Sequence, residues 1–280
     1  MRITKPVLGL SAVTALTLSL AAPATAITFG EPDDGEHPFG GIMVALVEGD
    51  DGELEPGWRC SGTLVSPTHF LTAGHCTYGA DAVEVWFDEE IDRDLSTYPV
   101  GGDDSVSGTP FTHPDYVDAA FYLNDLGMVV LDEKVEMEEY GLLPELGYFE
   151  DFFVKRGQNK QEFTAVGYGL QRSMPDQTGL TEAELERRQA TLRIINQDAA
   201  FGEKKAGNSV LFTNNASGGG TCSGDSGGPI FVEGTTTVAA VTSFGLNQIC
   251  AGTGGGYRVD TADDLDWLEE EFGLVSGQKW

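Results

Sequence analysis

Positively charged residues are scarce in this sequence of 280 residues. It contains 16 Lys and Arg against 45 Asp and Glu, which gives a formal net charge of −29. Proteins that bind nucleic acid neutralise its phosphates with clustered Lys and Arg. We therefore expect no nucleic-acid partner. The acids fall mostly in stretches that we expect to be loops, where they keep the surface solvated. Attraction of cationic substrates and adaptation to high salt are the other interpretations of this charge.

Long hydrophobic runs are missing after the first 26 residues. A membrane-spanning helix needs roughly 20 apolar residues, and no later stretch approaches that length. The N-terminus combines Arg2 and Lys5, an apolar run from Val7 to Ala22 broken by Ser and Thr, and the small residues Ala24-Thr25-Ala26. This order is typical of a secretory signal peptide rather than of a membrane anchor. We expect a secreted, extracellular protein without membrane contact after removal of residues 1–26, and its short signal peptide is compatible with a bacterial source.

Cysteine is limited to Cys60, Cys76, Cys222 and Cys250. An even number of cysteines in an oxidising compartment indicates two disulfides, for which three pairings are possible. A zinc site is disfavoured because no C-x-x-C pair is present and the intervals of 16 and 28 residues match no common zinc motif. No D-x-D-x-D-G loop indicates calcium, although calcium stays possible in so acidic a chain. We expect no metal and no cofactor.

Short apolar or β-branched runs recur between Gly, Asp, Asn and Pro. Many short strands with frequent turns favour an all-β barrel or sandwich. The expected strands are Ile42–Val47, Gly62–Val65, His69–Thr72, Val83–Phe87, Leu126–Leu131, Phe163–Val166, Thr191–Ile195, Ser209–Phe212, Pro229–Val232, Thr237–Thr242 and Gly256–Val259.

Two segments have the pattern of helices. Thr181–Arg188 opens with a Thr-x-x-Glu capping pattern, and Thr261–Phe272 places Leu265, Leu268 and Phe272 on one side. A boundary between two halves is expected around Gly147–Lys160.

The stretch Cys222-Ser-Gly-Asp-Ser226-Gly-Gly-Pro229 has the composition of a nucleophile loop. A hydroxyl becomes a good nucleophile only when a base takes its proton and when amide groups face the oxyanion that forms. Glycines on both sides allow the sharp turn and the close approach that this requires. Ser226 is therefore the candidate nucleophile.

The chain offers four histidines as the general base. His75 follows an apolar run and precedes Cys76, whose disulfide could hold the imidazole in place. His37 and His113 each precede a proline, and His69 falls inside an expected strand. His75 is therefore the candidate base.

A buried Asp should fix the orientation of that base. Asp125 directly precedes the apolar strand Leu126–Leu131, whereas Asp115, Asp118 and Asp132 lie among turn residues.

Ser226 also fits the G-x-S-x-G pattern of α/β-hydrolases, but that class requires a His after the Ser, and no His follows His113. An esterase is therefore disfavoured.

Three blocks, LTAGHC at 71–76, NDLGMVVL at 124–131 and GDSGGP at 224–229, resemble in this order the signatures of the trypsin/chymotrypsin-like serine peptidases. The resemblance runs from about Ile27 to Trp267. It implies two six-stranded antiparallel β-barrels, residues 27–150 and 151–280, with a C-terminal helix. It also implies a triad of His75, Asp125 and Ser226, with the backbone N–H groups of Gly224 and Ser226 as the oxyanion hole.

The resemblance further implies disulfides between Cys60 and Cys76 and between Cys222 and Cys250. Cleavage after Ala26 would expose Ile27-Thr-Phe-Gly30, which is similar to the Ile-Val-Gly-Gly start of active family members. In them the new ammonium pairs with the acid before the nucleophile, which is Asp225 here. We expect signal peptidase itself to leave an active enzyme, although Phe29 is bulkier than the family's Gly.

The positions that bind substrate can also be carried over from the family. Gly220 stands where enzymes that cut after Arg or Lys usually have Asp, so a neutral pocket for an apolar or aromatic residue before the scissile bond is expected. The hydroxyls of Thr221 and Ser223 make a small or acidic side chain the alternative. The residues implied in substrate binding are Gly220, Thr221, Ser223, Ser243, Gly245 and Gly255.

The function expected from these residues is a secreted serine endopeptidase that forms an acyl-enzyme on protein or peptide substrates and acts as a monomer. A binding protein on an inactive peptidase scaffold is the alternative from another class, because a fold alone does not imply activity.

Overall fold

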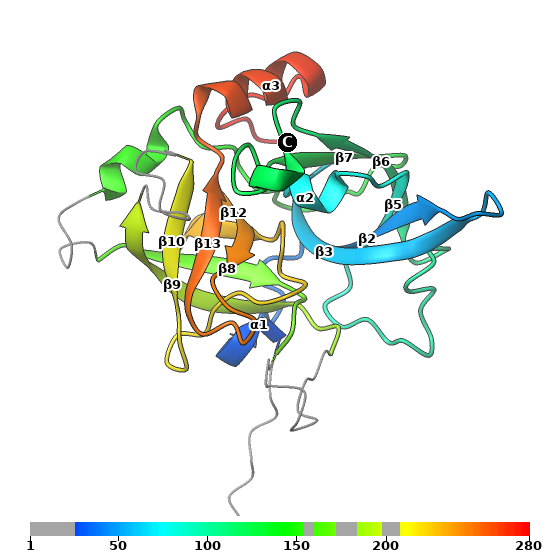
Figure 1. Ribbon diagram of the computed structural model, residues 1–280, viewed down its shortest axis with the longest axis horizontal. Helices are drawn as coiled ribbons and strands as arrows, with labels where there is room; N and C mark the ends of the chain where they lie inside the picture. Colours follow the sequence, from blue (N-terminus) through cyan, green and yellow to red (C-terminus); the bar gives the residue numbers. More distant parts are fainter. Residues whose placement is uncertain (1–25, 154–159, 172–183, 198–207) are drawn as a thin grey trace, which may run out of the picture.

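The computed structural model describes residues 26–153, 160–171, 184–197 and 208–280. Within them the chain forms two closed six-stranded antiparallel β-barrels, which lie side by side in Figure 1. Closure leaves no barrel strand with an unpaired edge. The expected all-β fold with two barrels and a C-terminal helix is confirmed.

The first barrel has the strand order β2-β3-β4-β7-β6-β5. Its strands are rich in Val, Leu, Ile and Phe, and their inward side chains fill a shared core. The strands are β2 (Gly40–Glu48), β3 (Leu54–Ser66), β4 (His69–Thr72), β5 (Ala82–Trp86), β6 (Val106–Thr112) and β7 (Gly127–Leu131).

The second barrel has the order β9-β10-β13-β12-β11-β8 and closes where β8 pairs with β9. The short strand β1 (Glu31–Pro32) adds to the outside of β9. The barrel strands are β8 (Glu162–Gly167), β9 (Arg188–Gln197), β10 (Ser209–Asn214), β11 (Pro229–Val232), β12 (Val238–Gly245) and β13 (Gly252–Arg258).

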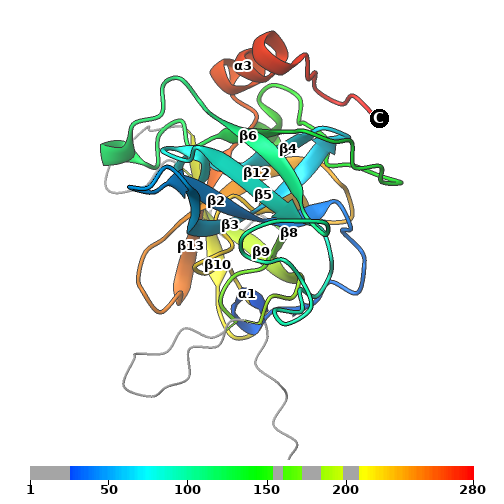
Figure 2. The same ribbon diagram turned by 90° about the vertical axis from the view of Figure 1, so that its right-hand side faces the viewer.

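Each barrel is covered in part by a segment from the other end of the chain. Helix α3 (Ala262–Phe272) follows the second barrel but packs on the first, where the ring of Phe272 contacts those of His69 and Phe111 at centroid distances of 5.7 and 5.4 Å. The turn α1 (Ala26–Phe29) contacts β8 and β9 of the second barrel instead. Figures 1 and 2 both show α3 and α1 at opposite ends of the molecule.

All eleven strands expected from the sequence are present, but one helix is not. Of Thr181–Arg188, residues 181–183 lie outside the described residues, and the remainder is extended: Glu186 pairs with Glu90 in an isolated bridge, and Arg188 begins β9. Arg187 is buried, where its Nε donates to Asp33 Oδ2 at 2.8 Å. Such tertiary hydrogen bonds override local helix propensity.

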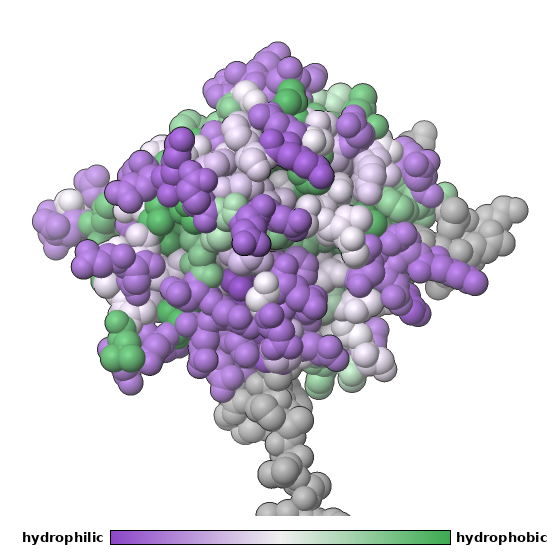
Figure 3. Space-filling view, turned by 180° about the vertical axis from the view of Figure 1, so that it is seen from behind, coloured by the Kyte–Doolittle hydropathy of each residue, from purple (hydrophilic) through white to green (hydrophobic). Residues whose placement is uncertain are grey.

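The remaining helical turns are α2 (Gly74–Thr77), η1 (Asp118–Ala120) and η2 (Tyr148–Phe152). None of the helices in the described ranges is long and apolar enough to span a membrane. Figure 3 shows a mostly hydrophilic face with scattered apolar side chains, as the many acidic residues of the sequence lead one to expect. The expected signal peptide lies outside the described residues, apart from Ala26.

Candidate active site

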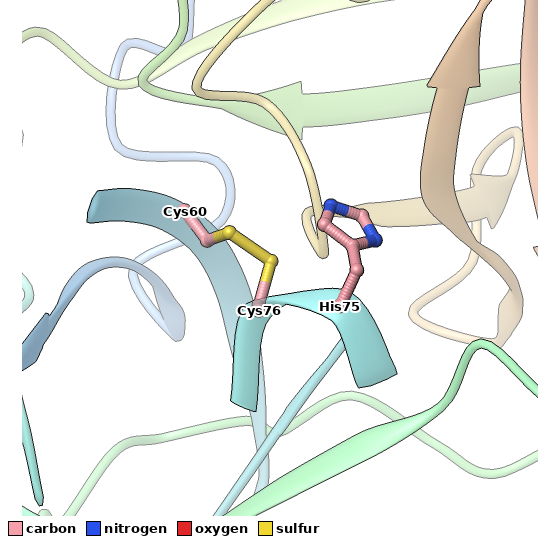
Figure 4. A group of neighbouring side chains, drawn as sticks. All are labelled: Cys60, His75 and Cys76. Carbon is pink, nitrogen blue, oxygen red and sulfur yellow. A yellow bond between two sulfur atoms is a disulfide. The ribbon is translucent and has the colours of Figure 1, made fainter. Parts of the chain in front are cut away.

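His75 lies on α2, directly after β4. Its neighbour Cys76 forms a disulfide with Cys60 on β3, which anchors the turn to the first barrel. Figure 4 shows the disulfide and the imidazole side by side on the same side of α2. The ligand atoms of Cys60, His75 and Cys76 lie within 4.8 Å of one another. They do not form a metal site, because the disulfide removes both thiolates that a metal would bind.

Asp125 immediately precedes β7 and is fully buried beside His75. Its Oδ2 lies 3.0 Å from Nδ1 of His75, and its Oδ1 accepts the backbone N–H of His75 at 2.8 Å. A carboxylate can only accept here, so Nδ1 carries the hydrogen and Nε2 is left free to take a proton. The pair has the arrangement of a general base held by an acid.

The Asp125 carboxylate also changes the charge state of the base. Burial alone would lower the pKa of His75, but attraction to Asp125, the hydrogen bond with it and the nearby Asp118 carboxylate raise this pKa above 6.5. A base whose pKa lies near the working pH can both accept and return a proton.

Ser226 is held between the two barrels by its own backbone and that of its neighbour. The N–H of Ser61 on β3 donates to the Ser226 carbonyl at 2.7 Å, and the N–H of Gly227 donates to the Thr242 carbonyl on β12 at 2.7 Å. Gly227 has a φ of +77°, and a Cβ there would lie 2.0 Å from Thr72 Oγ1. Only glycine fits at this position. The loop that carries Ser226 therefore lies directly against Thr72 at the end of β4, and Thr72 is three residues before His75.

The backbone N–H groups of Gly224 and Ser226 donate no hydrogen bond within the described residues. No hydrogen bond in this part of the chain joins Ser226 Oγ to His75 either. Catalytic hydrogen bonds commonly form only when substrate is bound.

Asp225 turns away from the solvent and is fully buried. Its carboxylate accepts the N–H groups of Cys222 at 2.8 Å and Gly169 at 2.7 Å. Burial nevertheless raises the pKa of Asp225 to about 7, because two amide donors and the nearby Arg59 do not fully replace the lost water.

The N-terminal segment lies close to this aspartate. Ile27 is fully buried in the core of the second barrel. The hydroxyl of Thr28 donates to the carbonyl of Leu170 at 3.4 Å. Leu170 directly follows Gly169, which is one of the two N–H donors to Asp225. In the uncleaved chain the Ile27 nitrogen is an amide, so no ion pair with Asp225 can form.

A cavity of about 320 Å³ opens beside Ser226. Four of the residues predicted to bind substrate, Thr221, Ser223, Ser243 and Gly245, line it, and the second disulfide, Cys222–Cys250, lies in its wall. Among the residues that the structure describes, no charged side chain lines this cavity. Both disulfides have the pairing implied by the family resemblance.

The other two predicted substrate-binding residues are not part of that lining. Gly220 is covered by Asn214: a Cβ on Gly220 would lie 2.2 Å from Asn214 Cγ. Gly255 is covered by the ring of Phe244, with a Cβ 2.2 Å from it. A larger open cavity of about 600 Å³ adjoins β9 and contains none of the predicted catalytic residues.

Sequence reasoning did not assign the roles of three side chains that surround the site. Asn214 fills the space beside Gly220, Asp118 acts on His75 from η1, and Arg59 lies against Gly224. No motif marks these roles, because the contacts depend on how the strands and loops pack against one another.

The comparisons with known proteins agree with this architecture. The family model described as Trypsin matches residues 33–268. Brachyurin from Leptuca pugilator is 29% identical over 222 residues, which cover 77% of this chain and 88% of that protein. Trypsin from Saccharopolyspora erythraea is 28% identical over 246 residues, with 86% and 96% covered.

A solved structure titled HL collagenase has the same fold, with a TM-score of 0.66 at 20% identity over 89% of this chain and 99% of that one. The family match covers most of the chain. The chain therefore belongs to the trypsin/chymotrypsin-like serine peptidase family and is a serine-type endopeptidase that acts on protein or peptide substrates.

Proposed function

We propose that the chain is a secreted endopeptidase in which Ser226 is the nucleophile, His75 the general base and Asp125 the residue that orients it. The observation that carries this proposal is the contact between Nδ1 of His75 and the buried Asp125 carboxylate, which leaves Nε2 free to take a proton. The fixed backbone of Ser226 between β3 and β12 supports it further.

In the proposed reaction, His75 Nε2 takes the hydroxyl proton of Ser226 while Oγ attacks the scissile carbonyl carbon. The imidazolium is stabilised by Asp125 and then returns the proton to the leaving amine as the C–N bond breaks. Water, activated by the same imidazole, hydrolyses the acyl-enzyme and releases the acid and free Ser226. No cofactor takes part.

The free N–H groups of Gly224 and Ser226 suit the oxyanion hole in this scheme. Neither is used by another acceptor in the described residues, so both can donate to the negative oxygen of the tetrahedral intermediate. Losing one such donor typically costs about 10²–10³-fold in kcat.

The neutral cavity beside Ser226 suits an apolar or aromatic residue before the scissile bond. Its described lining contains no acid that would pair with Arg or Lys. Burying a large apolar side chain there would contribute roughly 1.5–3 kcal/mol to binding. The hydroxyls of Thr221 and Ser223 keep a small or acidic side chain as the second candidate, which a peptide library would distinguish.

Secretion and activation are linked in this proposal. Ile27 has a φ of +47°, which is strained for a β-branched residue, and Phe29 has a φ of +59°. Cleavage after Ala26 removes the peptide bond that defines the φ of Ile27 and so removes that constraint. It also creates the ammonium that would pair with Asp225, and Thr28 already donates to Leu170, the neighbour of the Gly169 that donates to Asp225.

The proposal is tested by the intact mass of the secreted protein, with and without a fluorophosphonate probe, followed by peptide mapping. We expect a chain that begins at Ile27 and an adduct on Ser226 that a His75→Ala variant does not form. A folded, trimmed chain without an adduct would contradict the triad. A different N-terminus would contradict only the activation step.

A further inference from the structure

Arg59 lies beside the proposed oxyanion hole of a strongly acidic protein and has no ion-pair partner in the part of the chain that the structure describes. Its Nε lies 3.1 Å, and its Nη2 3.4 Å, from the position that a Cβ on Gly224 would take. The side chain is half-buried on β3. Arg187, Arg188, Arg193 and Arg258 each form an ion pair with a carboxylate, whereas Arg59 forms neither an ion pair nor a side-chain hydrogen bond within the described residues.

An ion pair with Asp225 does not account for this position. The Arg59 charge lowers the pKa of Asp225 at a distance, but the carboxylate points to the N–H groups of Cys222 and Gly169 and is fully buried. Arg59 as a residue is only half-buried, and its guanidinium forms no hydrogen bond within the described residues. Its five donors therefore stay available to a ligand.

The position of Arg59 assigns it to one half of the substrate. All residues that line the cavity beside Ser226 come from the second barrel. Arg59 belongs to the first barrel, on the same strand as Ser61, whose hydroxyl donates to the Gly224 carbonyl at 2.9 Å. With the acyl half of the substrate in the cavity and its carbonyl oxygen at Gly224, the half that leaves as the amine passes along β3.

We propose, on the basis of the function proposed above, that Arg59 binds a carboxylate of the leaving half of the substrate and so determines specificity after the scissile bond. An extended peptide advances about 3.3 Å per residue, so the carboxylate belongs to the first or second residue after that bond. It is either the side chain of Asp or Glu or the C-terminal carboxylate of a short peptide. A guanidinium matches either source, because its planar fork can donate two hydrogen bonds to one carboxylate.

The test compares kcat/KM for pairs of peptides that are identical up to the scissile bond. In the first kind of pair, a longer peptide has either Glu or Gln at the first or the second residue after the scissile bond. In the second kind, the peptide ends at that residue with either a free carboxylate or an amide. We expect at least one pair to favour the carboxylate by about tenfold in the native enzyme, the effect of one charge-assisted hydrogen bond.

Arg59→Gln should remove this preference, and Arg59→Glu should reverse it in favour of the uncharged peptide of the same pair. Because both peptides of a pair meet the same enzyme, a general loss of activity cancels in the ratio. Lys134→Gln is the matched control: Lys134 is exposed in the chain after β7, and this change removes the same charge without altering the ratio.

The pair that responds identifies the source of the carboxylate. A ratio near one for every pair in the native enzyme, or a ratio that Arg59→Gln leaves unchanged, would overturn the role of Arg59 while cleavage through Ser226 stands. An enzyme that cleaves no peptide and forms no probe adduct on Ser226 would overturn the proposed function together with this inference.

Discussion

Ser243 donates its hydroxyl hydrogen to Oδ2 of Asp125 at 2.5 Å, the same oxygen that lies 3.0 Å from Nδ1 of His75. Ser243 also lines the cavity beside Ser226. One side chain of β12 therefore links the wall of the proposed substrate pocket to the orientation of the base. The Asp125 charge is shared between donors from both barrels.

Replacing Ser243 by Ala should make His75 more basic. Without the hydroxyl donor, the Asp125 carboxylate attracts the imidazolium more strongly, and the pKa of His75 rises further. Since His75 acts as a base only when neutral, the acid limb of the kcat/KM profile should move to higher pH. A looser carboxylate should also lower kcat/KM by about tenfold.

The measurement is a pH profile with a single peptide substrate. Ser223→Ala serves as the control, because Ser223 lines the same cavity without touching Asp125, and its acid limb should stay in place. An acid limb that Ser243→Ala leaves unmoved would argue against the shared oxygen as the cause.

Replacing Asp118 by Asn should shift the acid limb in the opposite direction. The exposed Asp118 carboxylate contributes to the raised pKa of His75, so its neutralisation lowers that pKa and keeps the base active at lower pH. The shift should be smaller than about one pH unit, because solvent screens an exposed charge. High salt should reduce the shift in the native enzyme, and an equal shift in Asp132→Asn would assign it to net charge instead.

The barrels could be predicted from the sequence because the barrel strands other than β6 contain short apolar runs between turn residues. Strand β6 was missed since Gly108 and Pro110 interrupt its pattern, although its burial and pairing with β5 and β7 are set by the barrel. The helix expected over Thr181–Arg188 was wrong in its described part. There, the buried contact of Arg187 with Asp33 decides the conformation, and that partner lies 154 residues away.

The site was predictable to the extent that local motifs carry it. His75, Asp125 and Ser226 each lie in a recognisable block, and the structure brings His75 and Asp125 into contact. The contacts of Asn214 and Arg59 with the site could not be predicted from local motifs. They depend on how strands β10 and β3 pack against the loop that carries Ser226. The division into residues 27–150 and 151–280 stays a prediction, with the first barrel within 40–131 and the second within 162–258.

Introducing a side chain at Gly220 should destabilise the fold instead of changing the specificity. In the family an Asp at this position gives a preference for Arg and Lys. Here a Cβ would lie 2.2 Å from Asn214 Cγ and 2.7 Å from the Asn214 Cα, so the backbone of β10 would have to move. Gly220→Asp should therefore lower Tm and cleave after Arg no better than the native enzyme.

Gly245→Ala is the matched control for this prediction. Its Cβ would meet only the Asn247 carbonyl, at 3.5 Å, so Tm should stay near that of the native protein. Because Gly245 lines the cavity, the added methyl should lower kcat/KM for a bulky residue before the scissile bond. A stable Gly220→Asp enzyme that cleaves after Arg would show that Asn214 yields to the new side chain.

The charge of Asp225 should give the uncleaved and the cleaved chain opposite responses to pH. With Ala24-Thr25-Ala26 retained, burial holds the pKa of Asp225 at about 7, well above its value of 3.8 in an exposed state. A carboxyl group whose pKa is raised by folding contributes stability below pH 4, and this contribution is lost as the pH rises toward 7. The loss should reach up to about 4 kcal/mol relative to Asp225→Asn, in which this position does not titrate.

A chain that begins at Ile27 should not lose stability in this way. The ammonium of Ile27 would favour the ionised carboxylate and so lower the pKa of Asp225. The free energy of unfolding of the chain with Asp225, compared with that of Asp225→Asn, should therefore stay constant or increase up to pH 7. Urea unfolding of both chain lengths between pH 4 and 7 measures this difference, with Ser226→Ala in all chains to prevent self-digestion. The same pH response in both would mean that the Ile27 ammonium does not reach Asp225, and activation would then require another source of charge.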